Sequence, residues 1–304
     1  VLINEVGARD GLQNQPVQVS CDDKLRLIEA LAAAGVRAIE ATSFVSPKAV
    51  PQMADADHLF PRLAHPDRIA YSALVPNRRG LERARAAGVK EIAVVLSATD
   101  TMNRRNINMS LDEAQAMCVD TVRAAVADGV RAKAYVAVAF ECPFEGAVAP
   151  ARVLALSESM FAAGAQEVVI ADTIGAAAPA AVTRLLRECV AHFGAARLSA
   201  HFHDTRAMAM ANAWAALEQG IRKFDASVGG LGGCPFAPGA AGNAATEDLV
   251  VLFEQCGYDT GVDLDRLRQA VALAGALTGR AVGGRTTTWL QAGEEKQARQ
   301  AHTA

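Results

Sequence analysis

The sequence predicts an α/β fold, a (β/α)₈ TIM barrel with an additional C-terminal helix. Three observations lead to this prediction. Short apolar segments that look like strands recur about every 30 residues, each is followed by a stretch with helical periodicity, and about 250 residues hold eight such units. No Gly-x-Gly-x-x-Gly follows the first strand-like segment, which disfavours the alternative, a doubly wound open sheet.

The predicted strands are apolar runs of four to seven residues, the usual length of a strand buried in a parallel barrel. In chain order they are 2–6, 38–41, 69–74, 91–96, 132–138, 167–171, 198–202 and 223–227.

The predicted helices have apolar residues at helical spacing, as in 24–34, 81–87, 112–127 and 207–219. Ser110 and Glu113 form a capping-box pattern at the start of one of them. Several helices end in a glycine just before the next strand, as expected of a residue that must adopt a left-handed conformation. These glycines are Gly35, Gly88, Gly129, Gly164 and Gly220.

The repeating pattern divides the chain into two parts. Residues 1–258 form the predicted catalytic barrel, and residues 259–304 form a C-terminal helix and a polar tail that packs on the barrel or trails from it. The helix is expected from about Asp263, and the tail, residues 293–304, is polar enough to fray.

Composition excludes several classes of protein. The formal charge is -3 with no basic block, so no nucleic-acid partner is expected, and no apolar run is long enough for a membrane span. The six cysteines include no Cys-x-x-Cys pair, which argues against a zinc ribbon or a disulfide scaffold. With this cysteine pattern we expect a protein of the reducing cytoplasm, and no signal or transit segment is read before the first strand-like run.

In a barrel of this kind the reactive side chains collect in loops at the carboxyl ends of the strands. His201 and His203 end the seventh predicted strand and project from the same face, because side chains alternate along a strand. Two such imidazoles can bind one metal ion, although two unrelated histidines would give the same pattern. Asp10, after the first strand, offers the carboxylate oxygen that a hard cation prefers. Asn243 offers an amide oxygen as a fourth ligand, or is a cap or turn residue.

Three further charged residues lie at strand ends. Glu40 is inside the second apolar strand, where a carboxylate is costly unless it is paired. Arg9, after the neighbouring first strand, is the expected partner, and pairing would hold its guanidinium still for stabilising an anion. A purely structural ion pair is the alternative. Asp172 ends the sixth strand and either belongs to the site or caps the next helix.

A loop with six glycines, residues 229–243, follows the eighth strand and contains Cys234. It is either a phosphate cradle or a lid that carries Cys234 over the site when substrate binds. A lone cysteine is usually a small buried apolar residue. A cysteine flanked by Gly-Gly and Pro on a loop is poorly placed for the core, so we favour a reactive thiol.

Several of these segments together resemble the 3-hydroxy-3-methylglutaryl-CoA lyase family. The resemblance runs in register over nearly the whole barrel, from about residue 3 to about residue 256. The Arg-Asp-Gly and His-x-His features are shared by the wider group of metal-dependent barrel lyases and Claisen-type synthases, whereas Gly-Leu-Gly-Gly-Cys-Pro points to the lyases. The segments are EVGARDGLQN at 5–14, EATSFVSPKAVPQM at 40–53, residues 172–175 and 201–205, and GLGGCPFAPGAAGNAATED at 230–248.

The resemblance implies cleavage of 3-hydroxy-3-methylglutaryl-CoA to acetyl-CoA and acetoacetate with Mg²⁺ or Mn²⁺. It assigns metal ligation to Asp10, His201, His203 and Asn243. The partner would therefore be a small-molecule acyl-CoA, and the resemblance alone suggests a homodimer.

The resemblance also implies roles for the other strand-end residues. Arg9, steadied by Glu40, stabilises the enolate oxygen of the thioester, and Cys234 protonates the enolate carbon. Asp172 tunes or orients the side of the site that holds His201. A base from the cluster of His201 and the metal-ligating aspartate removes the hydroxyl proton, and the residues do not tell which group it is.

Some positions depart from the family pattern. They are Glu141, Ala176–Ala178 and Arg206-Ala207, none of which is a proposed ligand or acid. They leave open another 3-hydroxyacyl-CoA substrate, such as citramalyl-CoA. An acyl-CoA-condensing synthase and a metal-binding barrel without turnover are the competing functions. The synthases usually carry an extra C-terminal region, for which about 50 residues leave little room.

Overall fold

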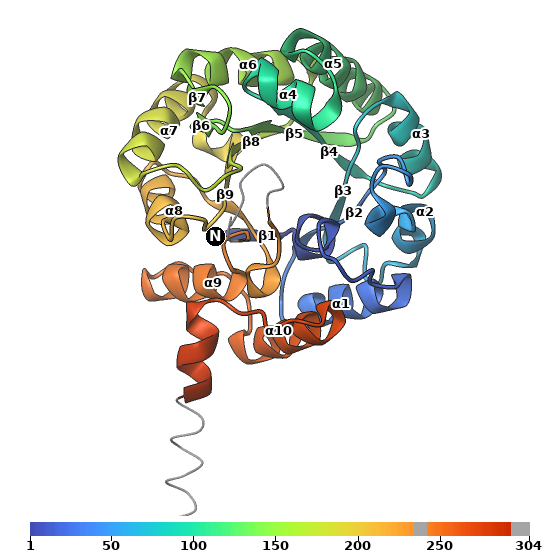
Figure 1. The fold of residues 1–304 in the computed structure, drawn as a ribbon, viewed down its shortest axis with the longest axis vertical. Helices are drawn as coiled ribbons and strands as arrows, with labels where there is room; N and C mark the ends of the chain where they lie inside the picture. Colours follow the sequence, from blue (N-terminus) through green and yellow to red (C-terminus); the bar gives the residue numbers. More distant parts are fainter. Residues whose placement is uncertain (234–241, 293–304) are drawn as a thin grey trace, which may run out of the picture.

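The computed structural model describes residues 1–233 and 242–292, and these form a closed barrel of eight parallel strands surrounded by helices (Figure 1). The strand order around the barrel is β1-β10-β9-β8-β5-β4-β3-β2, so the first and last strands pair and close it. The predicted TIM barrel is confirmed. The strands are β1 (Leu2–Glu5), β2 (Ala38–Ser43), β3 (Ala70–Leu74), β4 (Glu91–Ser97), β5 (Arg131–Ala137), β8 (Glu167–Asp172), β9 (Leu198–Phe202) and β10 (Lys223–Ala226).

Helices cover the outside of the barrel, as the alternating sequence pattern predicts. They are α1 (Cys21–Ala33), α2 (Ala56–Leu59), α3 (Arg78–Ala86), α4 (Asp100–Ile107), α5 (Leu111–Ala127), α6 (Pro150–Ala163), α7 (Pro179–Phe193), α8 (Ala209–Glu218), α9 (Thr246–Gln255) and α10 (Leu264–Thr278). Two short strands, β6 (Glu141–Cys142) and β7 (Gly146–Ala147), form a hairpin beside the barrel.

The helix ends have local causes that the sequence shows. The predicted capping box at α5 is confirmed, since Ser110 Oγ accepts from the backbone of Glu113 and the Glu113 carboxylate accepts from the backbone of Ser110. The five predicted terminal glycines all have positive φ, between 73° and 109°. Both signals need only a few neighbouring residues, so they can be recognised without the fold.

The apolar core lies between the strands and the helices, and the barrel interior is more polar. Glu40, Lys133, Tyr135 and Asp225 are all buried on inward-facing strand positions. The Tyr135 hydroxyl donates to Asp225 across the barrel, from β5 to β10, which are not neighbours in the strand order. The polar interior therefore connects strands that share no main-chain hydrogen bonds.

The C-terminal region contains α10 and a further helix at residues 285–292. The backbone of Asp263, which caps α10, donates to Ala34 at the end of α1, so α10 lies against the barrel wall. The helix at 285–292 points away from the barrel (Figure 1) and was not predicted. Its first backbone N–H groups donate to the Asp248 carboxylate on α9, a distant cap that sequence patterns do not show. Within the described ranges, none of the helices has the length and apolar character needed to cross a membrane.

Candidate active site

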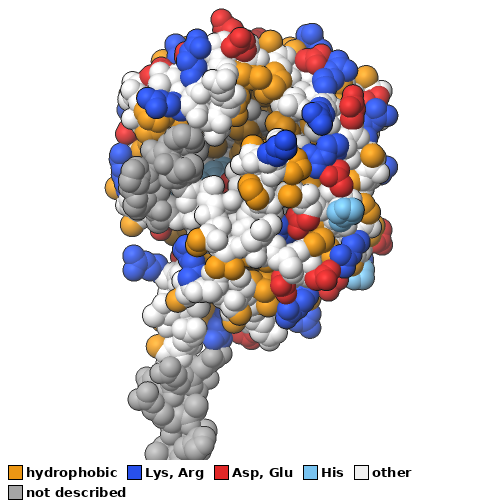
Figure 2. Space-filling model, turned by 45° about the vertical axis from the view of Figure 1, so that its right-hand side comes forward, with side chains coloured by type: hydrophobic (Ala, Val, Ile, Leu, Met, Phe, Trp, Pro, Cys, Tyr) orange, Lys and Arg blue, Asp and Glu red, His pale blue; other side chains and the backbone are white. Residues whose placement is uncertain are grey.

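Three of the predicted metal ligands lie together at the carboxyl ends of the barrel strands. Ligand atoms of Asp10, His201 and His203 are all within 4.8 Å of one another. Asp10 comes from the short π-helix η1 (Gly7–Gly11) after β1, His201 from β9, and His203 from just beyond it. Figure 2 shows a hollow in this side of the molecule with a histidine side chain visible inside it.

Asn243 joins this cluster through main-chain pairing. It forms an antiparallel bridge with His203, and its Nδ2 donates to Asp10 Oδ2 at 2.8 Å. Among the described residues, no hydrogen-bond partner reaches the buried Asn243 Oδ1 or the buried His203 Nδ1. A buried acceptor without a donor is costly unless something else satisfies it. A divalent cation suits these oxygen and nitrogen donors, so the residues fit a metal site.

Close packing of the π-helix η1 fixes the direction of Asp10 and Arg9. A Cβ on Gly7 would lie 2.6 Å from Glu5 Oε1, and a Cβ on Gly11 would lie 2.7 Å from Ser227 Oγ. A larger residue at either position would displace side chains at the end of β1 or just after β10. The same argument applies at Gly232, where a Cβ would lie 2.5 Å from Asn243 Nδ2.

Arg9 pairs with both Glu40 and Asp10. Its Nε donates to Glu40 Oε1 in a buried ion pair, and its Nη1 donates to Asp10 Oδ1 at 2.6 Å. Burial alone would lower the pKa of Arg9, but the charges of Glu40 and Asp10 raise it. Burial alone would raise the pKa of Asp10, but Arg9 and then the two histidines lower it to about 2. At neutral pH the guanidinium is therefore a fixed cation and Asp10 a fixed anion.

The two histidines have different environments. Burial and the neighbouring His201 lower the pKa of His203 to about 4, so its imidazole is neutral at pH 7 and able to bind a cation. Burial also acts to lower the pKa of His201, but the hydrogen bond and charge of Asp225 outweigh it and raise the value.

Asp225, Tyr135 and Asn4 were not predicted, and the structure places them directly behind His201. Asp225 Oδ2 lies 3.0 Å from His201 Nδ1, and the Tyr135 hydroxyl donates to the same oxygen at 2.7 Å. Asn4 Nδ2 donates to Asp225 Oδ1 at 2.7 Å. A signal was present for Asp225, because it is a carboxylate inside an apolar strand, as Glu40 is.

Asp172 serves the loop after β8. Its two carboxylate oxygens accept from the backbone N–H groups of Ala176 and Ala177 at 2.9 and 3.0 Å. The side chain therefore closes the turn that precedes α7, and the N-cap position of that helix is Ala178. Burial raises the pKa of Asp172, against the two backbone hydrogen bonds and the nearby charge of His201, with which it shares no side-chain hydrogen bond in the described residues.

Cys234, the predicted acid on the glycine-rich loop, lies outside the described residues, in the range 234–241.

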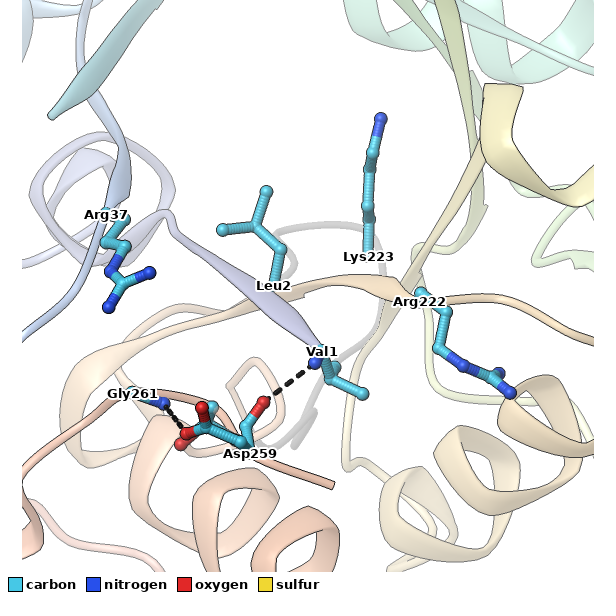
Figure 3. Close-up of a pocket in the computed structure, with 8 residues that line it drawn as sticks. Val1, Leu2, Arg37, Arg222, Lys223, Asp259 and Gly261 are labelled. Atoms are coloured by element: carbon cyan, nitrogen blue, oxygen red, sulfur yellow. Dashed lines mark hydrogen bonds between the residues drawn. The ribbon is translucent and has the colours of Figure 1, made fainter.

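A second hollow, of about 430 Å³, opens at the amino-terminal end of the barrel around Val1 and Arg222 (Figure 3). Two of its cationic groups are already engaged: Lys223 pairs with Glu167 at 2.6 Å, and Arg222 donates to the carbonyl groups of Leu217 and Ile221. TIM-barrel chemistry sits at the opposite end of the strands. The cluster around Asp10 is therefore the better candidate for the active site.

Comparisons with known proteins agree with this geometry over most of the chain. The sequence matches the protein family described as HMGL-like over residues 1–273. The hydroxymethylglutaryl-CoA lyase of Pseudomonas mevalonii is 46% identical over 281 residues, which are 92% of this chain and 93% of its own length. The 3-hydroxy-3-isohexenylglutaryl-CoA/hydroxy-methylglutaryl-CoA lyase of Pseudomonas aeruginosa is 41% identical over 292 residues, 96% of this chain and 97% of its own. An HMG-CoA lyase from Acinetobacter baumannii, solved in complex with coenzyme A and 3-methylmalate, superposes with a TM-score of 0.91 at 39% identity, covering 95% of this chain and 94% of its own.

Proposed function

The chain belongs to the HMGL-like family, and on that premise we propose that it is a carbon–carbon lyase that cleaves 3-hydroxy-3-methylglutaryl-CoA to acetyl-CoA and acetoacetate. One observation of the structure supports the proposal most: the cluster of Asp10, His201 and His203 lies next to a fixed guanidinium, and beside it Asn243 Oδ1 has no partner among the described residues. Cleavage of a 3-hydroxyacyl thioester needs two things, which we call the two halves of the site. One half is a metal site that acidifies the hydroxyl, and the other is a positively charged group, here Arg9, that stabilises the enolate.

The cofactor in this proposal is Mg²⁺ or Mn²⁺. The residues that would hold it are Asp10, His201, His203 and Asn243, whose oxygen and nitrogen donors suit either ion. When bound, such a cation would lower the pKa of the substrate's C3 hydroxyl and would favour substrates with a free carboxylate.

The chain's own residues then divide the remaining work. A base in the cluster of His201 and Asp10 accepts the hydroxyl proton, and the bond between C2 and C3 breaks. Arg9, held by Glu40, stabilises the negative charge that develops on the thioester oxygen. Cys234, which the sequence places in the adjoining loop, is proposed to donate a proton to C2, giving acetyl-CoA. Asp172 keeps the loop beside His201 in place.

The direct test uses protein stripped of metal with EDTA. We expect no acetoacetate from 3-hydroxy-3-methylglutaryl-CoA until Mg²⁺ or Mn²⁺ is added, and release of acetyl-CoA and acetoacetate in equal amounts afterwards. Asp10→Asn should abolish most of this activity, because it removes the carboxylate ligand. His192→Gln, which changes an exposed histidine on α7, is the matched control and should leave turnover intact. Failure of the wild-type protein to release products with either ion would overturn the proposal.

A second substrate deserves a parallel assay, because the relative from Pseudomonas aeruginosa is named for an isohexenyl-substituted substrate as well. A series of 3-hydroxyacyl-CoA thioesters with methyl, isohexenyl and citramalyl-type groups would rank them by kcat/KM. We expect the methyl-substituted thioester to rank first. A higher kcat/KM for another thioester would keep the reaction class and change the substrate. Synthesis of a condensed thioester from acetyl-CoA, without cleavage, would favour a synthase instead.

A further inference from the structure

A continuous line of buried side chains crosses the barrel interior and joins the two halves of the proposed site. It begins at Arg9, which donates to Glu40 on β2. Glu40 Oε2 lies 3.4 Å from the Tyr135 hydroxyl on β5, and that hydroxyl donates to Asp225 Oδ2 on β10 at 2.7 Å. Asp225 Oδ2 in turn lies 3.0 Å from His201 Nδ1 on β9. All five side chains are buried, so water does not compete for these contacts.

Asp225 is held from three directions. Its Oδ1 accepts from Asn4 on β1, and its Oδ2 accepts from Tyr135 and faces His201. Because three other strands supply these groups, the carboxylate cannot rotate without losing a hydrogen bond. A carboxylate facing Nδ1 keeps the imidazole proton on Nδ1, which leaves the Nε2 lone pair of His201 for a cation.

The Tyr135 hydroxyl occupies the position between the two carboxylates. Asp225 orients a metal ligand, and Glu40 orients Arg9, so each carboxylate serves a different half of the site. The phenol has a single proton. It donates that proton in the short hydrogen bond to Asp225, while its oxygen lies 3.4 Å from Glu40 Oε2. The hydroxyl therefore connects the two halves of the site a second time, in addition to the direct hydrogen bond between Arg9 and Asp10.

We propose that Asp225 and Tyr135 are positioning residues: Asp225, clamped by Asn4, fixes the His201 ring for metal binding, and Tyr135 ties that ligand to the Glu40–Arg9 pair. The proposal rests on the proposed function for its second half, since only a reaction that uses both a cation and Arg9 gains from a fixed distance between them. Its first half, metal binding, does not depend on the substrate.

The experiment compares Asp225→Asn, Tyr135→Phe and Asn4→Leu with the wild-type protein. The first readout is the Mn²⁺ dissociation constant of the metal-free protein, measured by isothermal titration calorimetry without substrate. Asp225→Asn should weaken binding about 10- to 100-fold, the usual effect of losing the partner behind a metal-ligating histidine. Asn4→Leu should weaken it less, because Asp225 Oδ2 keeps its contact with His201.

The second readout is kcat and KM at saturating Mn²⁺. Tyr135→Phe should lower kcat even when the metal site is full, with a smaller change in KM. The variant lacks the hydroxyl that connects Asp225 with the Glu40–Arg9 pair. Tyr71→Phe is the matched control: this buried tyrosine on β3 donates to the carbonyl of Ala64, away from the line. The Tyr71→Phe variant should have a lower free energy of unfolding, with no change in the Mn²⁺ dissociation constant or in kcat.

Each outcome decides the matter. A Mn²⁺ constant unchanged in Asp225→Asn would overturn the role of Asp225, and an unchanged kcat in Tyr135→Phe would overturn the tie. If Asp225→Asn fails to fold, Asn4→Leu and Tyr135→Phe still test both halves. If the wild-type protein binds Mn²⁺ but cleaves no thioester, the proposed function fails, while the comparison of Mn²⁺ constants still tests Asp225.

Discussion

At the scale of single residues, burial sets the protonation state of the groups around the candidate site. Asp10 stays ionised because Arg9 faces it, although burial opposes that state. His203 stays neutral because burial and His201 both disfavour its charged form. Charges that are fixed before substrate arrives need no rearrangement during the reaction, which is how preorganised sites lower barriers.

The first prediction concerns Arg9. Arg9→Gln should lower kcat by about 10²–10³, the usual effect of removing one group that stabilises an oxyanion. Mn²⁺ binding should not weaken, because Arg9 is not a ligand and its loss removes a cation beside Asp10. Steady-state kinetics and calorimetry measure the two effects separately. Arg9→Lys is the control for charge, and should recover only part of kcat because an ammonium cannot reproduce the fork geometry of the guanidinium. A wild-type kcat in Arg9→Gln would contradict the role.

A second residue-scale prediction concerns Glu5, a fully buried carboxyl at the end of β1. It accepts hydrogen bonds from Gly7, Val228 and Thr246, yet burial outweighs them and raises its pKa from 4.5 to about 7. The folded protein therefore retains a proton that the unfolded chain releases between these pH values. The free energy of unfolding should fall through this window as the pH rises, by up to about 3 kcal/mol from this group.

Glu5→Gln is the test of that pH dependence, since the uncharged amide oxygen can accept from Gly7 and Val228 and the amide nitrogen can donate to the Thr246 hydroxyl. Relative to wild type, the variant should gain free energy of unfolding as the pH rises from 4.5 to 7. Urea unfolding in EDTA at several pH values measures the difference without metal effects. Parallel curves for the two proteins would show that Glu5 titrates equally in both states.

The sequence revealed the residues at strand ends and Glu40 inside the barrel, but it missed Tyr135 and Asp225 there. Asp10, His201 and Asn243 follow from the rule that TIM-barrel chemistry collects at one end of the strands. Tyr135 and Asp225 are 90 residues apart on strands that are not neighbours, so only the closed barrel brings them together. The side chain of Asp172 was visible, but its hydrogen bonds to its own loop were not.

At the scale of elements, the ends of strands and the C-terminal ends of helices were predictable because their signals are local, whereas α1 and α3 begin three residues before the predicted 24 and 81. The predicted strands agree with the observed ones to within two residues, and the largest difference is β2, which continues to Ser43. The short π-helix η1 and the β6–β7 hairpin were not predicted. Both depend on contacts with other parts of the fold, such as the packing of Gly11 against Ser227.

The capping box of α5 gives the element-scale prediction. Ser110→Ala removes the side-chain acceptor for the Glu113 backbone and should lower the free energy of unfolding by about 1 kcal/mol. Urea denaturation monitored by circular dichroism measures the loss. Ser110→Thr keeps the hydroxyl and should lose much less. The kcat of both variants should stay near that of the wild type, because α5 lies on the outside of the barrel.

At the scale of the whole molecule, the proposed cation links the two ends of the barrel sequence. Asp10 follows the first strand, and Asn243 follows the last. A ligand that binds only the folded state stabilises it by mass action, by about 2.7 kcal/mol at 100 times its dissociation constant. We therefore expect saturating Mn²⁺ to raise the melting temperature by a few degrees, measured by scanning calorimetry. Asp10→Asn should show little of this increase, and an equal increase in both proteins would place the ion elsewhere.

The barrel as a whole could be predicted because the strand–helix pattern repeats along the sequence. The way the C-terminal region packs against the barrel could not be predicted. The helix at 285–292 begins where Asp248 accepts its first N–H groups, which depends on the tertiary position of α9. The cytoplasmic location and the homodimer stay predictions.

The pairing of β1 with β10 has a consequence for biosynthesis. During translation β1 leaves the ribosome more than 200 residues before its partner, since Leu2 pairs with Lys223. One edge of the nascent sheet must therefore wait exposed, open to association with other chains or to chaperones. The active site can form only when β10 pairs with β1 and closes the barrel. Chains truncated before β10 would therefore be inactive.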